Sequence, residues 1–333
     1  MKFLVIRFSS IGDIVQTTPV FRCIQQKIVT AEVHFLTKKK FDVVTKHNPY
    51  INRFHYFDNN LQEIIASLKE EDFDYVIDLQ RSIRSARITN ALKKPCIKVK
   101  KLSFRKILLT KLKIRTGKLS HFTQRCLDTL KPFNLKDDGK GLDYFIGEEE
   151  KISINDLPAT HHAGFITIVT GANYKVKRLP PEKVRQLCEI INHPVILLGG
   201  KEVYEEGEAI AASDPYKIYN ACGTFSLNES ADILQRSKLV VSNDTGFQYI
   251  ACAFKKPVIA VWGATTPEIG VGPYYGSIQA EKLSDNIIVQ PKLWCQPCTR
   301  FGVHKCPLGH FKCMNQHNIE YIHNLILERL QNL

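Results

Sequence analysis

Short apolar runs alternate with segments of helical periodicity along the chain. The apolar runs predict buried strands at residues 3–8, 32–36, 75–79, 165–170, 194–198, 239–242 and 257–262. The periodic segments predict helices at residues 14–28, 41–47, 64–71, 82–92, 181–191, 205–212, 226–235 and 247–253. Strands that alternate with helices in this way form parallel sheets with right-handed crossovers. The pattern therefore predicts an α/β fold.

The length of the chain and one polar stretch indicate two domains. The chain has 333 residues, whereas a single hydrophobic core rarely grows past roughly 250–300 residues. Residues 136–158 are polar, acidic and contain glycine, as linkers do. We predict one domain at residues 1–150, a second at 151–318, and a C-terminal helix in 319–333 that can cross back onto the first. Ligands of such sheets bind at the carboxyl ends of the strands, so the turns there are the expected sites of chemistry.

The sequence indicates neither a membrane span nor a signal peptide. No stretch approaches the ~18–20 uninterrupted apolar residues of a span. The N-terminal apolar run stops at Arg7 and lacks the small-residue cleavage site of a signal peptide. We therefore expect a cytoplasmic protein whose ten cysteines are reduced.

Most of the positive charge lies in one segment. Of the net charge of +13, eleven charges come from residues 93–118, which contain no Asp or Glu. Apolar residues recur there at helical spacing between the cations, at Phe104, Ile107, Leu108, Leu109 and Leu112. Such a basic amphipathic stretch binds anionic membrane surfaces; the alternative is a surface helix that packs on its own domain. We favour peripheral contact with an anionic membrane.

The turn Asp244-Thr245-Gly246 joins a predicted strand to a predicted helix. The first amides of a helix lack partners and lie at the positive end of its dipole, so they bind anions. Gly246 lets a phosphate approach the backbone, and Thr245 adds a hydroxyl donor. The alternative is ordinary helix capping, since Asp and Asn are favoured there in any case.

Two further turns of the second domain carry polar groups. Thr170 and Gly171 end a strand and precede three cations within four positions, among them Lys177. A positioned lysine stabilises the charge of a departing diphosphate without a metal; the alternative is a solvated basic loop. Glu202 follows the next strand, where a carboxylate accepts hydrogen bonds from ribose hydroxyls in other nucleotide-binding folds.

The first domain offers a candidate base and candidate anion contacts. Asp13 follows the first strand, beside Ser10 and Gly12, where a carboxylate can accept the proton of a hydroxyl group; helix capping is the alternative. Arg81, Arg84 and Arg87 recur three apart after the strand 75–79, which predicts one basic helical face. Guanidinium groups there suit phosphate or carboxylate groups of an acceptor.

Taken together, these segments resemble the heptosyltransferase family of bacterial lipopolysaccharide core synthesis, glycosyltransferase family 9. The resemblance spans nearly the whole chain in order. The segments that carry it are RFSSIGDIV at 7–15 with Thr18-Pro19, KVKRLP at 175–180, SNDTG at 242–246, KPVIAVWG at 256–263 and TTP at 265–267. One departure is Leu179, where many members have Trp, which puts the contacts beside Lys177 in doubt.

This resemblance implies a GT-B fold, with two Rossmann-like domains whose parallel sheets face each other across a cleft. It implies an inverting, metal-independent transfer of a sugar, usually heptose from ADP-heptose, onto an anionic lipid-linked acceptor at the inner face of the cytoplasmic membrane. Asp13 resembles the general base, and Lys177 resembles the lysine that holds the donor phosphates. The other matched positions resemble donor contacts, at Thr170, Gly171, Glu202 (or Glu205), Asp244, Thr245 and Gly246, and acceptor contacts, at Ser10, Gly12, Arg81 and Arg84.

Four cysteines form a cluster with the spacing C-x2-C-x7-C-x6-C, at Cys295, Cys298, Cys306 and Cys313. Four thiols close in sequence can complete a tetrahedral zinc site of structural type. The wide second spacing is unusual for zinc, and disulfides are the alternative, which a reducing cytosol disfavours. No cofactor is expected for catalysis itself.

Two other functions fit parts of the sequence. A nucleotide-sugar epimerase has a similar two-domain fold but gives the basic segment no role. A nucleic-acid-binding protein with a zinc-ribbon-like tail would use the basic segment and the cysteines, and would bind with strong salt dependence. Because it leaves the ordered strand-end turns unexplained, we expect a sugar transferase and no nucleic-acid partner.

Overall fold

The computed structural model describes residues 1–58 and 60–332. Its internal contacts divide the chain into two units. The first consists of Met1–Lys101 and Ser120–Phe145, and the second consists of Leu102–Leu119 and Ile146–Leu333. The division at residues 145 and 146 falls inside the polar stretch 136–158. The basic segment 93–118 is divided between the units: residues 93–101 belong to the first and residues 102–118 to the second, although the whole segment lies within the first predicted domain.

The first unit is built on a parallel sheet of five strands in the order β3-β2-β1-β4-β5. The strands are β1 (Lys2–Ile6), β2 (Glu32–Thr37), β3 (Arg53–Tyr56), β4 (Tyr75–Asp78) and β5 (Cys96–Lys98). The helices are α1 (Ile11–Val15), α2 (Thr18–Lys27), α3 (Leu61–Glu70), α4 (Ile83–Leu92) and α6 (Phe122–Leu127), with 3-10 helices η1 (Lys39–Val44) and η3 (Asp128–Phe133). Residues 3–6 of the central strand β1 are fully buried, as expected for a strand in a parallel sheet covered on both faces.

The helix predicted at 14–28 is two helices. Pro19 lies in the first turn of α2, where its missing N–H would have no intrahelical partner in any case. The chain therefore ends α1 at Val15 and starts α2 at Thr18.

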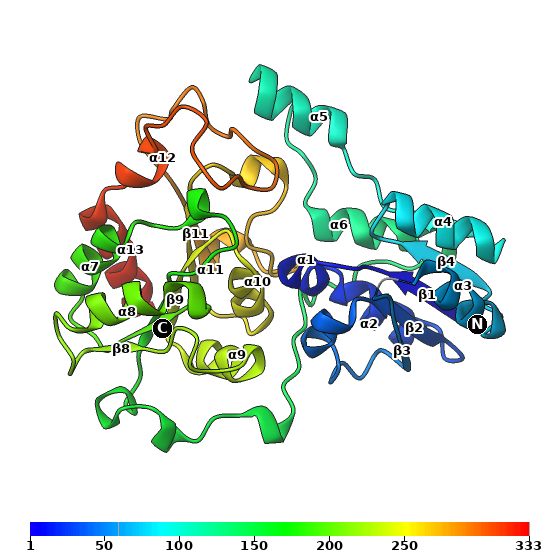
Figure 1. The fold of residues 1–333 in the computed structure, drawn as a ribbon, viewed down its shortest axis with the longest axis horizontal. Helices are drawn as coiled ribbons and strands as arrows, with labels where there is room; N and C mark the ends of the chain where they lie inside the picture. Colours follow the sequence, from blue (N-terminus) through cyan, green and yellow to red (C-terminus); the bar gives the residue numbers. More distant parts are fainter. Residues whose placement is uncertain (59, 333) are drawn as a thin grey trace. The chain divides into compact units, whose positions relative to one another are not determined.

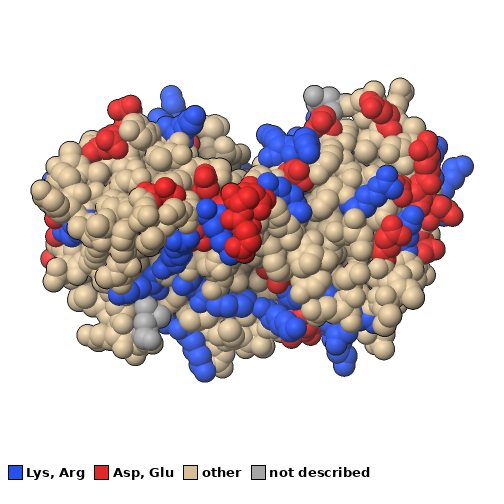
Figure 2. All heavy atoms as spheres, turned by 90° about the horizontal axis from the view of Figure 1, so that it is seen from below, with Lys and Arg blue, Asp and Glu red and all other residues tan. Residues whose placement is uncertain are grey.

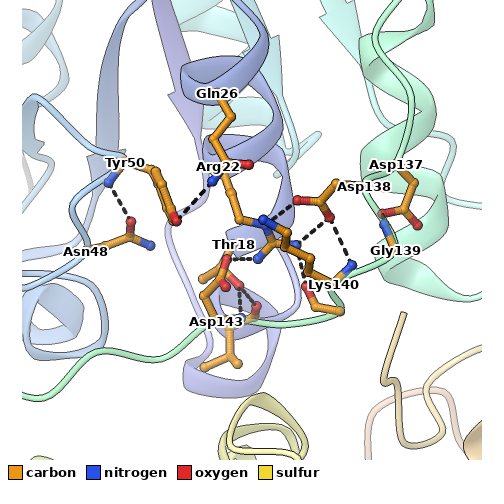
Figure 3. Close-up of polar contacts among 12 residues, drawn as sticks. Thr18, Arg22, Gln26, Asn48, Tyr50, Asp137, Asp138, Gly139, Lys140 and Asp143 are labelled. Carbon is orange, nitrogen blue, oxygen red and sulfur yellow. Dashed lines mark hydrogen bonds and ion pairs between the residues drawn. The ribbon is translucent and has the colours of Figure 1, made fainter. Parts of the chain in front are cut away.

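A buried arginine connects α2 to the end of the first unit (Figure 3). The Arg22 side chain is 2% exposed; its Nε and Nη2 donate to Asp138 at 2.7 and 2.9 Å, and Nη1 pairs with Asp143. Nη2 also donates to Gly141 O at 2.8 Å, and Thr18 Oγ1 accepts from the Asp143 amide at 2.9 Å. These bonds attach residues 138–143, which lead out of the first unit, to helix α2.

The second unit is built on a parallel sheet of six strands in the order β11-β10-β9-β6-β7-β8. The strands are β6 (Ile166–Val169), β7 (Val195–Leu198), β8 (Ile218–Asn220), β9 (Leu239–Asn243), β10 (Val258–Trp262) and β11 (Ser284–Ile288). The α-helices are α5 (Ser103–Ile107), α7 (Pro181–Ile190), α8 (Tyr204–Ala211), α9 (Leu227–Arg236), α10 (Gly246–Ala253), α11 (Ala280–Leu283), α12 (Lys312–Asn315) and α13 (Ile319–Gln331). Shorter helical turns are η2 (Leu108–Leu112), η4 (Glu148–Glu150), η5 (Ile154–Asp156), η6 (Ala159–His161), η7 (Lys175–Lys177), η8 (Lys201–Val203) and η9 (Pro267–Ile269).

The C-terminal helix α13 packs on the second unit. Figure 1 shows it on the same side of the second sheet as α7 and α8. Ile319, Ile322 and Ile326 are buried in the core that also contains strands β6, β7, β9 and β10. The structure therefore places α13 with the domain that precedes it, which differs from the predicted return to the first domain. Every helix within residues 1–58 and 60–332 is too short or too polar to span a bilayer.

Residues 102–119, which contain the amphipathic part of the basic segment, form α5 and the π-helical turn η2 and pack on the second unit through few residues. Leu109 is buried, whereas Phe104 and Leu112 are 72% and 61% exposed. Lys113 Nζ donates to the carbonyls of Cys295 and Pro297, each at 2.7 Å. Figure 2 shows acidic and basic side chains together on one face of the molecule, so the net positive charge is not spread uniformly over that surface. The apolar residues of this segment therefore divide between a buried anchor and an exposed set.

Candidate functional site

The strand order places two loops of the second unit at one point of the sheet. From β6 the chain moves outward through β7 to β8, and from the adjacent β9 it moves the other way through β10 to β11. The loops after β6 and β9 therefore diverge, and ligands of open α/β sheets bind in the crevice at such a switch point. Lys177 follows β6, and Asp244 follows β9.

An ion pair joins these two loops. Lys177 Nζ lies 2.6 Å from Asp244 Oδ2, and the side chains are 13% and 10% exposed. Thr265 Oγ1, in the loop after β10, donates to the same carboxylate oxygen at 2.7 Å. Asn243 connects the loops a second time, because its Oδ1 accepts from the Leu179 amide at 3.2 Å and its Nδ2 donates to Val169 O at 3.0 Å. The lysine is thus held at a fixed place by three loops of one sheet edge.

The start of α10 has donors without partners. Thr245 is its N-cap, and no side chain caps the helix. The Thr245 hydroxyl oxygen is buried and has no hydrogen-bond partner among the described residues. Gly246 is the first residue of the helix, so its amide and the next two lack intrahelical acceptors. A hydroxyl, free amides and the nearby Lys177 form an arrangement suited to a phosphate group.

The ends of β6 and β7 lie close together. A Cβ on Gly171 would meet Gly199 Cα at 3.0 Å, so glycine permits this approach. Thr170 Oγ1 lies 3.3 Å from Cys222 Sγ and is buried. Glu202 lies on η8 beyond β7 and is exposed; its Oε1 accepts from Arg178 Nη2 at 3.3 Å. The structure thus brings the predicted Thr170, Gly171 and Glu202 to one edge of the sheet.

The first sheet has its own switch point between β1 and β4. Arg7, which follows β1, spans it: Nη1 donates to Leu79 O at 2.8 Å, Nε donates to Ser9 O at 2.8 Å, and Nη2 lies 2.8 Å from Asp13 Oδ2. Asp13 lies in the first turn of α1. The amide and hydroxyl of Ser10 donate to the same Oδ2 at 3.1 and 3.0 Å. Oδ1 has no hydrogen bond to a residue that the structure describes, so one carboxylate oxygen is held and the other is available.

These contacts determine the basicity of Asp13. Burial acts to raise the pKa of Asp13, but the charge of Arg7 and the hydrogen bonds from Ser10 outweigh it, so that the pKa lies below 3.8. The carboxylate is therefore ionised at neutral pH. Gly12 is buried beside it in α1, and Ser10 is exposed at the helix start.

The predicted acceptor arginines lie near the end of β4. Arg81 precedes α4 with φ of 49°, and its amide donates to Asp78 Oδ1 at 2.7 Å. The prediction that Arg81 shares one helical face with Arg84 is therefore wrong, because the helix starts only after the cap Ser82. Arg84 lies in the first turn of α4, with its guanidinium 6.0 Å from the centre of the Phe57 ring. Both arginines are exposed.

Several groups of side chains among the described residues could hold a metal, including Cys23 with Asp137 and Asp138 and His47 with Glu149 and Glu150, and two others bear on the predictions. The four cysteines of the C-terminal cluster line one small cavity in the second unit. In the first unit, ligand atoms of His34, His55 and Glu71 lie within 4.8 Å of one another. There, however, Arg53 lies 2.6 Å and Lys2 3.5 Å from the Glu71 carboxylate. Those two cations already neutralise the carboxylate, so this histidine pair is a buried polar network of the first sheet.

The sequence also relates the chain to known proteins. The model of glycosyltransferase family 9 (heptosyltransferase) matches residues 61–309. The chain belongs to glycosyltransferase family 9. It is therefore a glycosyltransferase, as the sequence predicted, and the epimerase and nucleic-acid alternatives are not supported.

Individual relatives agree with this family. Lipopolysaccharide heptosyltransferase 1 of Campylobacter coli is 26% identical over 294 residues, covering 80% of this chain and 84% of that protein. Among solved structures, a family 9 glycosyltransferase from Veillonella parvula has a TM-score of 0.78 at 17% identity, covering 100% and 98% of the two chains. The ADP-heptose heptosyltransferase II of Escherichia coli has a TM-score of 0.72 at 18% identity, covering 100% and 99%. The predicted GT-B fold is confirmed.

Sequence reasoning missed three residues that organise the site. Arg7 holds Asp13, Asn243 connects two loops, and Thr265 holds Asp244. Each residue lies inside a segment that carries the family resemblance. Its contact, however, is made by a side chain to a residue that is not adjacent in the sequence. The local pattern gave no sign of these pairs.

Proposed function

We propose that this family 9 glycosyltransferase transfers heptose from ADP-heptose to a lipopolysaccharide core acceptor, with inversion at the anomeric carbon and without a catalytic metal. The observation that carries the proposal is the Lys177–Asp244–Thr265 network at the start of α10. The names of related proteins support the choice of sugar and acceptor, because the C. coli relative is a lipopolysaccharide heptosyltransferase. The E. coli heptosyltransferase WaaC, with the same fold, has been solved with ADP.

The second unit binds the donor in this proposal. The diphosphate lies at the start of α10, where the Gly246 amide and the Thr245 hydroxyl donate to its oxygens. Lys177 stays paired with Asp244 on one side and directs its remaining N–H groups to the phosphate. A fixed ammonium group supplies the charge stabilisation that a metal gives in other transferases. Glu202 accepts hydrogen bonds from the ribose, and Thr170 and Gly171 lie beside the bound donor nucleotide.

Asp13 acts as the general base. The acceptor hydroxyl oxygen forms a bond to the anomeric carbon while the bond from that carbon to the phosphate oxygen breaks, and the hydroxyl proton passes to Asp13 Oδ1. Attack from the side opposite the leaving diphosphate inverts the configuration. The lowered pKa of Asp13 makes it a weak base in the resting protein, so proton transfer completes only as the acceptor oxygen becomes acidic through bond formation.

The acceptor is anionic and lipid-linked. Arg81 and Arg84 are exposed and follow β4, which pairs in parallel with β1, so they lie at the same edge of the first sheet as Asp13. Phosphate or carboxylate groups of the acceptor core bind their guanidinium groups. The exposed apolar residues of segment 102–119, together with its cations, place the enzyme on the anionic inner face of the cytoplasmic membrane, where such an acceptor is embedded.

A nucleotide panel tests the donor class. The thermal unfolding midpoint of the full chain is measured with ADP, UDP, GDP, CDP and their sugars. A ligand at about 100 times its Kd stabilises the folded state by about 2.7 kcal/mol, so ADP and ADP-heptose should raise the midpoint and the others should not. A response to UDP-sugars alone would favour the epimerase, and no response to any nucleotide would refute the donor site.

Turnover measurements test the remaining parts. The anomeric configuration of the product, determined by NMR, should be opposite to that of the donor. The initial rate should be unchanged when EDTA is added at the start of the assay. Retention of configuration would contradict the single displacement, and an immediate loss of rate with EDTA that Mg²⁺ restores would contradict metal independence.

A further inference from the structure

The cysteine cluster encloses a cavity that the proposed transfer does not use. Cys295, Cys298, Cys306 and Cys313 line a space of about 30 Å³ beside the end of β10. Its other walls are Gly263, Ala264, Gln296, Pro307, Leu308 and His310. The space is comparable to that of a single water molecule or ion. All four thiols are free, and Cys313 is buried.

His310 donates a hydrogen bond toward this cluster. The amide of Lys312 donates to His310 Nδ1 at 3.0 Å, so Nδ1 is an acceptor and the ring proton of the neutral form lies on Nε2. Nε2 lies 3.9 Å from Cys295 Sγ, and its proton therefore points to that sulfur. A donor directed at a sulfur stabilises a thiolate more than a thiol. His310 thus suits the role of an outer partner of a thiolate, and it leaves the ligand positions to the cysteines.

The loop that carries the first two cysteines is fixed to the end of β10 through Cys298, Thr299 and Gln296. The Cys298 and Thr299 amides donate to Ala264 O at 3.0 and 3.3 Å. Gln296 Nε2 donates to Gly263 O at 2.6 Å. The chain from Gly263 to Thr265 is therefore attached to the cysteine loop on one side, and on the other side Thr265 holds Asp244.

The four cysteines line one cavity, but their sulfurs are farther apart than the ligand atoms of a bound metal ion. The described groups with three ligand atoms within 4.8 Å of one another do not include them. A cysteine has a single side-chain torsion before its sulfur, and three of the four are only partly buried. Rotation about these torsions can bring the sulfurs toward an ion in the cavity without displacing the backbone that the Ala264 and Gly263 bonds hold.

We propose that the four cysteines bind one thiophilic divalent cation of the zinc or ferrous class, and that this ion stabilises the Gly263–Thr265 turn that positions Asp244. Thiolates select soft or borderline cations over magnesium and calcium. Binding deprotonates the thiols and releases their protons to solvent. His310 Nε2–H then donates to the Cys295 thiolate, in the manner of the outer partners that orient metal ligands. The role is structural, because four thiolates complete a tetrahedral coordination and leave no position for a reactant.

Metal content and cobalt spectroscopy test the site. Purified full chain should contain about one zinc or iron atom per molecule, and the metal-free protein should bind one Zn²⁺ in competition with a chromophoric chelator. The Co²⁺-loaded protein should show thiolate-to-metal charge-transfer bands, which histidine and carboxylate ligands do not produce. Absence of these bands, or four thiols that titrate freely in the presence of Zn²⁺, would overturn the proposal, as would recovery of the cysteines as disulfides from protein kept under reducing conditions.

Variants separate the ligands from their neighbours. Loss of an outer partner typically lowers metal affinity about 10–100-fold. Loss of a ligand in Cys306→Ser should therefore weaken zinc binding at least as much. His310→Ala should retain one zinc, which distinguishes an outer partner from a ligand. Cys96→Ser, at a partly buried cysteine of the first unit, is the matched control and should leave zinc binding unchanged. If Cys306→Ser does not fold, the cobalt spectrum of the wild-type protein still decides the question.

The coupling to the donor site has its own readout. This part of the inference rests on the proposed function. Removal of the ion should weaken ADP binding several-fold, and readdition of Zn²⁺ should restore it. If zinc binds through the thiols but ADP affinity does not change, the stabilising role fails while the metal site stands. If neither form binds ADP, the donor assignment fails instead.

Discussion

Lys177 Nζ and Asp244 Oδ2 lie 2.6 Å apart and join the loops that follow β6 and β9. These strands are neighbours at the switch point of the second sheet, where the order in which the chain adds strands reverses. The lysine is thereby held beside the unpartnered start of α10, and its position depends on a carboxylate that Thr265 holds in turn. In the proposed function, this pair positions the lysine charge for the donor diphosphate.

Loss of the Lys177 ammonium should lower turnover sharply. Lys177→Ala removes a fixed donor to the leaving diphosphate, and removal of one such donor typically lowers kcat about 10²–10³-fold. Steady-state kinetics with ADP-heptose measure the effect. Lys175→Ala is the matched control, because Lys175 lies in the same short turn but is exposed. Equal kinetics of the two variants would remove Lys177 from the donor site.

The Arg7–Asp13 pair should determine the acidic limit of activity. Because the pKa of Asp13 lies below 3.8, its protonation should cause no loss of kcat/KM between about pH 8 and pH 5. Arg7→Met removes the cation that holds the pKa down, so the acidic limb of kcat/KM should move to higher pH. Arg7→Lys keeps the charge and should move it less. Superimposable pH profiles of the wild type and Arg7→Met would contradict this relationship.

Asp13 itself is tested by a conservative change. Asp13→Asn keeps the shape of the side chain but cannot accept a proton, so transfer should be abolished while ADP binding stays unchanged. Calorimetric titration with ADP provides that second measurement. Turnover near the wild-type rate would exclude Asp13 as the base.

The strands that the sequence pattern failed to predict are all at sheet edges. β3, β5, β8 and β11 are the outer strands of the two sheets, whereas every inner strand was predicted within a few residues. An inner strand is buried on both faces and has a continuous apolar run. Edge strands are short and carry charged or polar residues, which discourage pairing with other chains. β5, for example, is only Cys96–Lys98. Periodicity cannot distinguish such a strand from a loop.

The site could be predicted only in part, for a similar reason. The turns at Asp13, Lys177 and Asp244 are recognisable because each follows a strong apolar run and belongs to a segment shared with the family. The contacts that determine their chemistry join residues far apart in sequence, as Thr265 and Asp244 do. Helical periodicity also placed Arg81 on α4, although the chain turns through a left-handed conformation there before the helix begins.

The histidine pair of the first sheet should make stability depend on pH. Burial, assisted by neighbouring His34, lowers the pKa of His55 from 6.5 to about 4, although Glu71 acts in the opposite direction. Between these values the unfolded chain binds a proton that the folded chain does not, so the free energy of unfolding should fall as the pH falls from 6.5 toward 4. One pKa unit corresponds to about 1.36 kcal/mol, which gives a loss of about 3 kcal/mol across the window.

Urea unfolding at several pH values isolates this contribution. His55→Gln keeps a donor for His34 Nδ1, which His55 Nε2 contacts at 2.9 Å, but it does not titrate. The variant should lose stability less steeply than the wild type on acidification, since the carboxylates titrate alike in both. His323→Gln, on α13, controls for the loss of a histidine elsewhere. The prediction fails if His55→Gln and the wild type share one pH dependence.

Arg22 should be essential for the stability of the first unit. Arg22→Met removes the guanidinium group that pairs with the largely buried carboxylates of Asp138 and Asp143. Breaking a buried ion pair by removing one partner costs about 3–5 kcal/mol, which chemical denaturation measures directly. Lys27→Met, at the exposed end of the same helix, should change the free energy of unfolding by about 0.5 kcal/mol or less. Similar small effects of both changes would show that the network in Figure 3 contributes little.

Membrane association should depend on the exposed apolar residues of segment 102–119. Phe104 and Leu112 are 72% and 61% exposed, and burial of such a side chain in a membrane interface is worth about 1.5–3 kcal/mol. Phe104→Ser with Leu112→Ser should therefore reduce partitioning onto phosphatidylglycerol vesicles by about tenfold or more in sedimentation. Val29→Ser with Tyr216→Ser, at positions that are 97% and 83% exposed in other parts of the chain, should have no effect. Lys113 is left unchanged because it anchors the segment to the cysteine loop.

Binding to uncharged phosphatidylcholine vesicles should be weaker, since each Lys or Arg near an anionic surface contributes about 1 kcal/mol. Equal partitioning of the two double variants would show that the segment only packs against its own unit, because the loss would then not follow the apolar residues that the structure leaves exposed.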